Sequence, residues 1–181
     1  MTRVVLSIGS NLGDRLARLQ SAVDGLGAAV RAVSPVYETA PWGGIEQGPF
    51  LNAALIAEDP ALDGRGWLHR AQQLERAADR VRGLRWGPRT LDVDLIACYE
   101  GDTEVICREN GLMLPHPLAH LRAFVLVPWL AIDPGAGLTV SGRKRSAGEL
   151  LAELEPVDRA GVRPTGLTLS RRREPDAETA R

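Results

Sequence analysis

The chain has 181 residues, of which 44% are hydrophobic and 25% charged, a composition typical of one globular domain. Its formal net charge of −1 provides no overall field that would recruit nucleic acid or an acidic membrane. No apolar run approaches the roughly 18 residues that a membrane span needs, and the N-terminus MTRVVLSIGSN lacks signal-peptide features, so we expect a cytoplasmic protein.

The N-terminal half mixes strands and helices. Short runs rich in β-branched residues predict strands, and apolar residues at helical spacing predict helices. Pro35 falls inside one predicted strand and marks an edge position or a bulge there. The predicted elements are strands at 4–9, 29–39 and 50–58, helices at 14–26 and 66–81, and a Gly/Pro-rich loop at 40–50.

The C-terminal half begins with a second loop, at 80–89, which glycine and proline interrupt. The stretch TLDVDLIACY (90–99) then alternates and predicts a strand. A hairpin and a helix at 119–130 follow, and Ser146 with Glu149 forms a capping-box pattern before a last helix.

Strands and helices do not alternate strictly, as they would in a parallel sheet. The order favours an α+β fold, an α/β sandwich whose helices cover a largely antiparallel sheet. From about residue 159 the sequence is polar and rich in Arg, Glu and Pro. We therefore expect one domain over residues 1–158 and a disordered tail over 159–181.

Asp92 and Asp94 lie two residues apart on the predicted strand, so their side chains share one face and the apolar residues around them occupy the other. Two carboxylates on one face repel each other unless a cation lies between them. Mg²⁺ takes one or two protein carboxylates together with substrate phosphates. The pair indicates a magnesium site, with a solvated sheet edge as the alternative.

The loop before this pair is basic. Arginine forks bind phosphate in a bidentate manner, and Trp86 in the same loop offers a flat face to a purine or a guanidinium. A P-loop is excluded, because the chain has no G-x-x-x-x-G-K motif. The loop and the aspartates together indicate a Mg-nucleotide site, with packing of Trp86 in the core as the alternative. The arginines are Arg80, Arg82, Arg85 and Arg89.

Other residues carry weaker signals. Phe50 directly follows the first loop, and with Asn52 it suits a flat heterocycle that has donor and acceptor edges. His116, within LPHP, is more often structural in such a context, and zinc is not expected. Cys98 and Cys107 are expected as reduced thiols, with pairing across a hairpin as the alternative.

These motifs resemble those of the 6-hydroxymethyl-7,8-dihydropterin pyrophosphokinase family. The resemblance implies a ferredoxin-like fold and transfer of diphosphate from ATP to the hydroxymethyl group of the pterin, which gives the pterin diphosphate and AMP in folate biosynthesis. It also implies a monomer whose partners are ATP and 6-hydroxymethyl-7,8-dihydropterin, without nucleic acid or membrane. In order over residues 4–155, the matching stretches are SIGSNLGDR, VYETAPWG, FLNAAL, RVRGLRWGPRTLDVDLI and LPHPLAHLRAFVLVPW.

The resemblance further implies roles for individual positions. Asp92 and Asp94 would bind two Mg²⁺ ions, and Arg80 and Arg89 would be catalytic cations. Both loops would close over ATP. The implied ATP contacts are Gln72, Glu75, Arg82, Arg85, Trp86, His116 and Arg122. The implied pterin contacts are Ala40, Trp42, Phe50, Asn52 and Phe124, with the two phenylalanines as a sandwich.

The chain departs from the family pattern in two places. The family usually has a basic residue and a threonine just before its Pro-His, where this chain has NGLML at 110–114, so a nucleotide contact is missing there or comes from the backbone. For the tail beyond 159 we expect no counterpart in the family.

Two other classes stay open. An RNA-binding module would need aromatics on central strands and a basic face. A Mg-dependent phosphohydrolase could use Asp92 and Asp94, but it would leave the arginine loop and the aromatic residues unexplained. Hydrolysis of ATP without pterin would distinguish this second class.

Overall fold

The computed structural model describes residues 2–41, 46–78 and 90–171. Every strand pairing in its main sheet is antiparallel, and β2 (Val30–Val33) pairs with the same strand as its neighbour β3. In spatial order, the strands are β11 (Arg163–Pro164), β3 (Tyr37–Thr39), β4 (Phe50–Asp59), β1 (Thr2–Ser10), β5 (Asp92–Glu100) and β6 (Thr103–Glu104).

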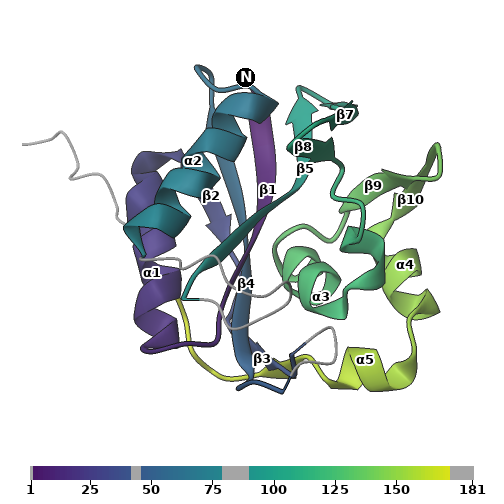
Figure 1. Ribbon diagram of the computed structural model, residues 1–181. Helices are drawn as coiled ribbons and strands as arrows, with labels where there is room; N and C mark the ends of the chain where they lie inside the picture. Colours follow the sequence, from purple (N-terminus) through teal and green to yellow (C-terminus); the bar gives the residue numbers. More distant parts are fainter. Residues whose placement is uncertain (1, 42–45, 79–89, 172–181) are drawn as a thin grey trace, which may run out of the picture.

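Helices cover both faces of this sheet (Figure 1). One face carries α1 (Arg15–Leu26), the 3-10 helix η1 (Gly27–Ala29) and α2 (Gly64–Ala77). The other carries the 3-10 helix η2 (Ala119–Leu121), α3 (Ala123–Ile132), α4 (Ala147–Glu153) and α5 (Pro156–Ala160). Two small hairpins complete the fold: β7 (Cys107–Glu109) with β8 (Leu112–Leu114), and β9 (Gly137–Val140) with β10 (Arg143–Ser146). The predicted α+β sandwich is confirmed.

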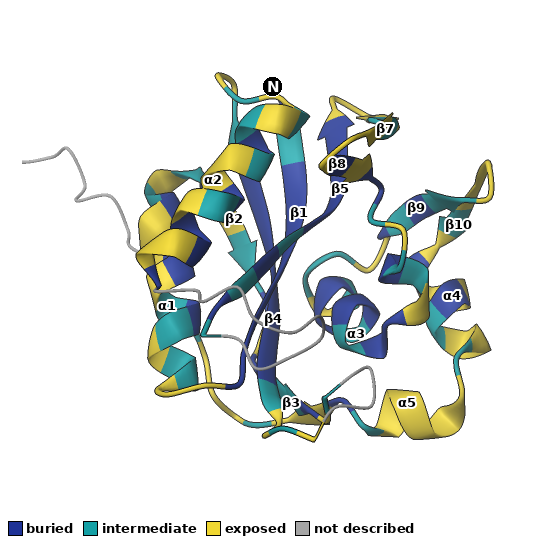
Figure 2. Ribbon diagram, viewed as in Figure 1, coloured by how far each residue is buried: buried dark blue, intermediate teal, exposed yellow. Residues whose placement is uncertain are grey.

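Alternation along the central strands creates two hydrophobic cores (Figure 2). Between the sheet and α1/α2, the buried side chains include Leu55 on β4 and Trp67 on α2. Between the sheet and α3/α4, they include Ile56 on β4 and Trp129 on α3. Each central strand is therefore buried on both sides along most of its length.

The predicted elements of the N-terminal half are confirmed within the described residues. Asp14 caps α1 by accepting a hydrogen bond of 3.0 Å from the Ala17 amide. The predicted strand at 29–39 is divided into β2 and β3, because Pro35 between them has no N–H to donate to a neighbouring strand.

The predicted helix at 119–130 begins later than expected. Residues Ala119–Leu121 form a 3-10 turn, and Arg122 has extended backbone angles, φ −116° and ψ 102°, before α3 starts at Ala123. The chain is therefore extended, not helical, at Arg122, one of the predicted ATP contacts.

The C-terminal segment differs from the disordered tail expected from residue 159. Residues up to Arg171 are described; they include the end of α5 and strand β11, and Ser170 is hydrogen-bonded to α1. The rest of the predicted tail, 172–181, lies outside the described residues. Cys98 and Cys107 are both free, as expected, and burial raises the pKa of the Cys98 thiol to about 11.

Candidate active site

The aspartate pair opens β5 on the face that α3 covers. Val93 and Leu95 point into the core beneath α1 and α2, so Asp92 and Asp94 point the other way and remain partly exposed. The prediction that the two carboxylates share a face is confirmed. At this end of β5 the described strand pairing is with β1, because β6 pairs with residues 99 and 100 at the other end of β5. The carboxylates thus lie where the sheet is accessible to a ligand.

Glu75 fixes the backbone between the two aspartates. It lies near the end of α2, is only 9% exposed, and its Oε1 accepts a hydrogen bond of 2.9 Å from the Val93 amide. Gln72 lies three residues earlier on the same helix face and is partly buried. Glu75 was expected as an ATP contact, which stays a prediction; its described hydrogen bond anchors the strand that presents the carboxylates.

Arg122 supplies a buried cation beside the pair. Its side chain is 6% exposed, and Nη1 lies 3.6 Å from Asp94 Oδ2. The guanidinium carbon lies 5.5 Å from the centroid of the Phe124 ring. Burial lowers the pKa of Arg122, whereas Asp94 and Asp92 raise it, so the fold places positive charge where two carboxylates are crowded.

His116 is held in one tautomer. Its backbone amide donates to Ile96 O over 2.8 Å, and its Nδ1 accepts from the Leu118 amide over 3.1 Å, which leaves the proton on Nε2. Burial and the nearby charge of Arg122 lower the pKa of His116 to about 4. At neutral pH the ring is therefore an uncharged hydrogen-bond donor.

Asn52 and Asp92 lie in one row across the sheet. Gly9 on β1 pairs with Asp92 on β5 and with Asn52 on β4. A Cβ at Gly9 would lie 2.8 Å from Asn52 Oδ1 and 3.4 Å from Phe50 Cδ1, so the glycine makes room for both side chains. Asn52 is 4% exposed, and its Nδ2 donates over 2.6 Å to Thr39 Oγ1, which fixes the orientation of the amide.

Three of the predicted pterin contacts, Phe50, Asn52 and Phe124, lie on the same face of the sheet. Phe50 and Asn52 alternate with the core residues Leu51 and Ala53, and therefore face α3. Phe124 is in the first turn of α3, which packs on β4. Ala40 is exposed just beyond β3.

Several contributors to this region were not singled out from the sequence. Gly9, within the matching stretch SIGSNLGDR, lies inside β1. Asn11 donates from Nδ2 to Gln47 Oε1 over 2.8 Å and to Gly48 O over 3.0 Å. The turn after β1 is therefore hydrogen-bonded to residues 47 and 48, in the described part of the first loop. A glycine within an apolar strand was the available signal for a close approach.

Six predicted site residues lie outside the described residues: Trp42, Arg80, Arg82, Arg85, Trp86 and Arg89. The divergent stretch at 110–114 forms the turn and strand of the β7–β8 hairpin.

The donor set fits magnesium better than a transition metal. Within residues 2–41, 46–78 and 90–171, no group of three or more His, Cys, Asp or Glu side chains could hold a metal ion. Two carboxylates on one strand match the few protein ligands that Mg²⁺ takes when substrate phosphates complete its shell.

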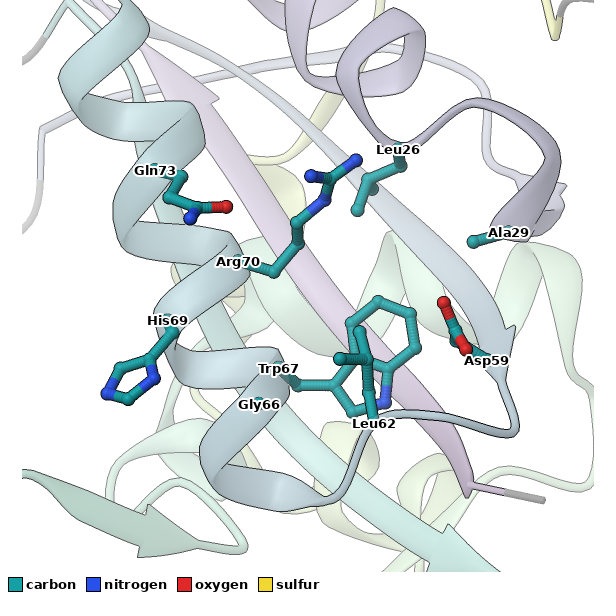
Figure 3. A pocket seen from close by; sticks show the side chains of 9 residues that line it. All are labelled: Leu26, Ala29, Asp59, Leu62, Gly66, Trp67, His69, Arg70 and Gln73. Atoms are coloured by element: carbon teal, nitrogen blue, oxygen red, sulfur yellow. The ribbon is translucent and has the colours of Figure 1, made fainter.

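A separate hollow of about 410 Å³ lies on the opposite face of the sheet, between the end of α1 and the first turns of α2 (Figure 3). Arg70 extends across it and donates to Gly25 O at the end of α1. Its lining residues are Leu26, Ala29, Asp59, Leu62, Gly66, Trp67, His69, Arg70 and Gln73, so it is distinct from the predicted site.

Among the described helices, none is both long enough and apolar enough to cross a membrane.

Comparison with known proteins identifies the family. The model of the 7,8-dihydro-6-hydroxymethylpterin-pyrophosphokinase family matches residues 5–134. A 2-amino-4-hydroxy-6-hydroxymethyldihydropteridine pyrophosphokinase of Mycobacterium tuberculosis is 68% identical over 168 residues, covering 90% of this chain and 89% of that protein. The protein of the same name from Mycobacterium leprae is 66% identical over 183 aligned residues, covering 98% of this chain and 96% of that protein. That alignment extends past residue 159, so the expectation that the tail has no counterpart is wrong.

Solved structures agree on the fold. The wild-type HPPK-DHPS of Plasmodium falciparum aligns with a TM-score of 0.59 at 13% identity, over 84% of this chain and 44% of that longer chain. This likeness confirms the predicted ferredoxin-like α+β fold. The chain belongs to the 6-hydroxymethyl-7,8-dihydropterin pyrophosphokinase family, enzymes of folate biosynthesis that transfer diphosphate.

Proposed function

We propose that this chain transfers diphosphate from Mg-ATP to the hydroxymethyl oxygen of 6-hydroxymethyl-7,8-dihydropterin and releases AMP. The observation that carries the proposal is the row of Asp92, Gly9 and Asn52 across three neighbouring strands. Adjacent strands lie about 4.8 Å apart, so the carboxylate and the amide are attached to backbones about 10 Å apart. That spacing suits a pterin held by Asn52 whose alcohol reaches toward phosphates near Asp92.

The protein groups in this row supply alignment and charge. Phosphoryl-type transfer depends mainly on positioning and on neutralising negative charge. Asp92 and Asp94 would hold two Mg²⁺ ions, which would neutralise charge on the triphosphate and on the departing AMP. Arg122 can donate to a phosphate oxygen, and the Nε2–H of His116 offers a neutral donor beside it.

The pterin side rests on the preset amide of Asn52. Thr39 Oγ1 accepts a hydrogen bond from one N–H of Asn52 Nδ2. This contact fixes the orientation of the amide, so that Asn52 Oδ1 and its second N–H could bond the edge of the pterin ring. Phe50 and Phe124 provide apolar surface for the two ring faces. Glu75 acts through the backbone of Val93, so we propose it as a positioning residue for the carboxylates as well as an ATP contact.

The remaining roles stay predictions. Arg80 and Arg89 are proposed to stabilise charge on the transferring group, and Arg82, Arg85 and Trp86 to contact ATP. Trp42 is proposed to contact the pterin, and Gln72 to contact ATP. A monomeric state and a cytoplasmic location also remain predictions.

The decisive experiment measures AMP formed from Mg-ATP with and without 6-hydroxymethyl-7,8-dihydropterin, in parallel with pterin diphosphate. We expect AMP only when the pterin is present, in equal amount to pterin diphosphate, and loss of both products in EDTA. Phosphate or ADP released without pterin would instead favour a phosphohydrolase. No product from folded protein under any condition would overturn the proposal.

A further inference from the structure

The segment from Arg163 to Arg171 extends the sheet beyond β3. Arg163 and Pro164 pair with Glu38 and Tyr37. Thr165 then donates to Val36 O from both its amide, over 3.3 Å, and its hydroxyl, over 2.7 Å. The segment therefore covers the side of β3 that faces away from β4.

The other end of the segment is anchored to α1 and β2. Gln20 and Ser170 form a reciprocal pair: Gln20 Nε2 donates to Ser170 O over 2.8 Å, and the Ser170 amide donates to Gln20 Oε1 over 3.0 Å. Arg171 donates to Arg31 O over 2.6 Å, and Leu169 packs against the core beneath α1. Figure 1 shows the segment, in yellow, leaving α5, passing β3 and reaching α1. It is held at both ends rather than only at β3.

The segment covers β3, the strand that supports the pterin side of the proposed site. β3 has only three residues, and its last one, Thr39, orients the amide of Asn52. Such a short strand gains little from a ladder on one side alone. A second ladder from residues 163–165 makes β3 an interior strand and limits its freedom at Thr39.

A charged network links the same segment to the residue before Phe50. The carboxylate of Glu38 accepts from Arg163 Nη2 over 3.2 Å and from Arg15 Nη1 over 3.0 Å. Arg15 Nη1 also donates to Pro49 O over 3.0 Å. The chain of contacts thus runs from the segment, through Glu38 and Arg15, to the backbone that presents Phe50.

We propose that residues 163–171 are a positioning element for pterin binding: they fix Thr39 and Pro49, and through them the amide of Asn52 and the ring of Phe50. This inference rests on the proposed function. The ATP side of the site is built on β5, α2 and α3, whereas the hydrogen bonds of the segment reach β2, β3 and α1. Loss of the segment should therefore weaken pterin binding selectively.

The test compares two shortened chains, one ending at Val162 and one ending at Arg171. The chain ending at Val162 keeps α5 and loses every contact that residues 163–171 make. We expect its KM for the pterin to rise about tenfold, because a few hydrogen bonds of about 1 kcal/mol each no longer hold the site and 1.4 kcal/mol is a factor of ten. The KM for ATP and kcat should stay within about twofold of their values in the full chain, since the segment takes no part in the chemical step. The chain ending at Arg171 should match the full chain in all three constants.

Other outcomes overturn the inference. An unchanged pterin KM, an equal loss in all three constants, or the same loss in the chain ending at Arg171 would each contradict a selective role. If the chain ending at Val162 does not fold, the double variant Gln20→Ala/Thr165→Val loosens both ends of the segment within the full-length protein. An unchanged pterin KM in that variant would then be decisive against the proposal.

Failure of the proposed function would look different. In that case the full chain itself would form no AMP with pterin. Amide hydrogen exchange at residues 36–40 and 46–52 would still decide the inference: exchange should accelerate in the chain ending at Val162, or in the double variant, and not in the chain ending at Arg171. Equal protection in all of them would overturn it.

Discussion

The two faces of β1, β4 and β5 are made by the same strands but have different composition. The face beneath α1 and α2 is apolar from Leu51 to Ala57 on β4, and its core extends along all three strands. The face beneath α3 is apolar at one end only, around Ile56 and Ile96; toward the other end it presents Asn52 and the aspartate pair. One side of the sheet therefore contributes stability along its whole length, while the other combines stability with a polar site.

The difference follows from where α3 begins. Because the chain is extended at Arg122, α3 starts late and covers the apolar end of the face, while Arg122 and Phe124 border the polar end. A polar end is tolerable because the opposite face keeps these strands buried. Substitutions on the two faces should thus have separable effects, one on stability and the other on catalysis.

The largest effect is expected at the aspartates. Asp92→Asn and Asp94→Asn should each lower turnover by at least about a thousandfold, since charge stabilisation by a bound metal contributes several kcal/mol and each 1.4 kcal/mol is a factor of ten. The Tm should change by less than about 4 °C, because both side chains are partly exposed. AMP formation and thermal unfolding measure the two quantities. Near-normal turnover in both variants would refute the metal assignment.

The opposite face should show the reverse pattern. Leu55 is fully buried beneath α1 and α2, so Leu55→Ala should reduce the free energy of unfolding by about 2–5 kcal/mol. Turnover of the folded enzyme at low temperature should stay within about twofold. Urea unfolding checks the first expectation, and Val157→Ala, at a side chain that is 75% exposed, is the control, with a loss below about 0.5 kcal/mol. If Leu55→Ala impaired catalysis without destabilising the fold, the separation of the faces would fail.

Gly9→Ala should affect the polar end directly. The new methyl group would lie 2.8 Å from Asn52 Oδ1, so the amide must move, at a cost of about 1–3 kcal/mol. We expect the pterin KM to rise about tenfold or more, with a smaller change in the KM for ATP. The matched control is Gly148→Ala in α4, where the nearest atom is Ser146 Oγ at 4.0 Å. A wild-type pterin KM in Gly9→Ala would show that the close approach to Asn52 is unimportant for binding.

The smallest effect concerns pH. The folded pKa of His116 is lowered to about 4, below its unfolded value near 6.5, so between these values the unfolded chain binds the additional proton. Lowering the pH from 7 to 5 should therefore destabilise the protein through His116 by at most about 2 kcal/mol. Urea unfolding in EDTA should show a smaller pH dependence in His116→Asn, which keeps an acceptor for the Leu118 amide. Identical pH dependence in both proteins would contradict a neutral, buried His116.

Local pattern in the sequence was sufficient for most of the strands and helices and for the shared face of the aspartate pair. Period-two alternation placed Asp92 and Asp94 on one face, and helical spacing with a capping aspartate located α1. The family resemblance supplied the roles of side chains toward ATP and pterin, which stay predictions; the family itself is confirmed. These features depend on residues that are close in the chain.

The features that were missed depend on register between distant segments. Gly9 acquires its role only because β1 pairs with β4 and β5 in a register that brings Asn52 against it. Glu75 bonds a backbone amide 18 residues away, and Gln20 pairs with Ser170 across 150 residues. Composition predicted disorder after residue 159, because a polar segment cannot form a core of its own, but the edge of β3 offers it backbone partners.

The sequence by itself thus determined the family through its motifs. It also determined most of the strands and helices and the face that the two carboxylates share, since alternation and spacing are set by local geometry. Only the tertiary structure decided which backbone amide donates to Glu75, why position 9 favours glycine, and where the C-terminal segment lies. Those outcomes depend on strand register and helix packing, which minimise the free energy of the whole chain and are not encoded in any single stretch of it.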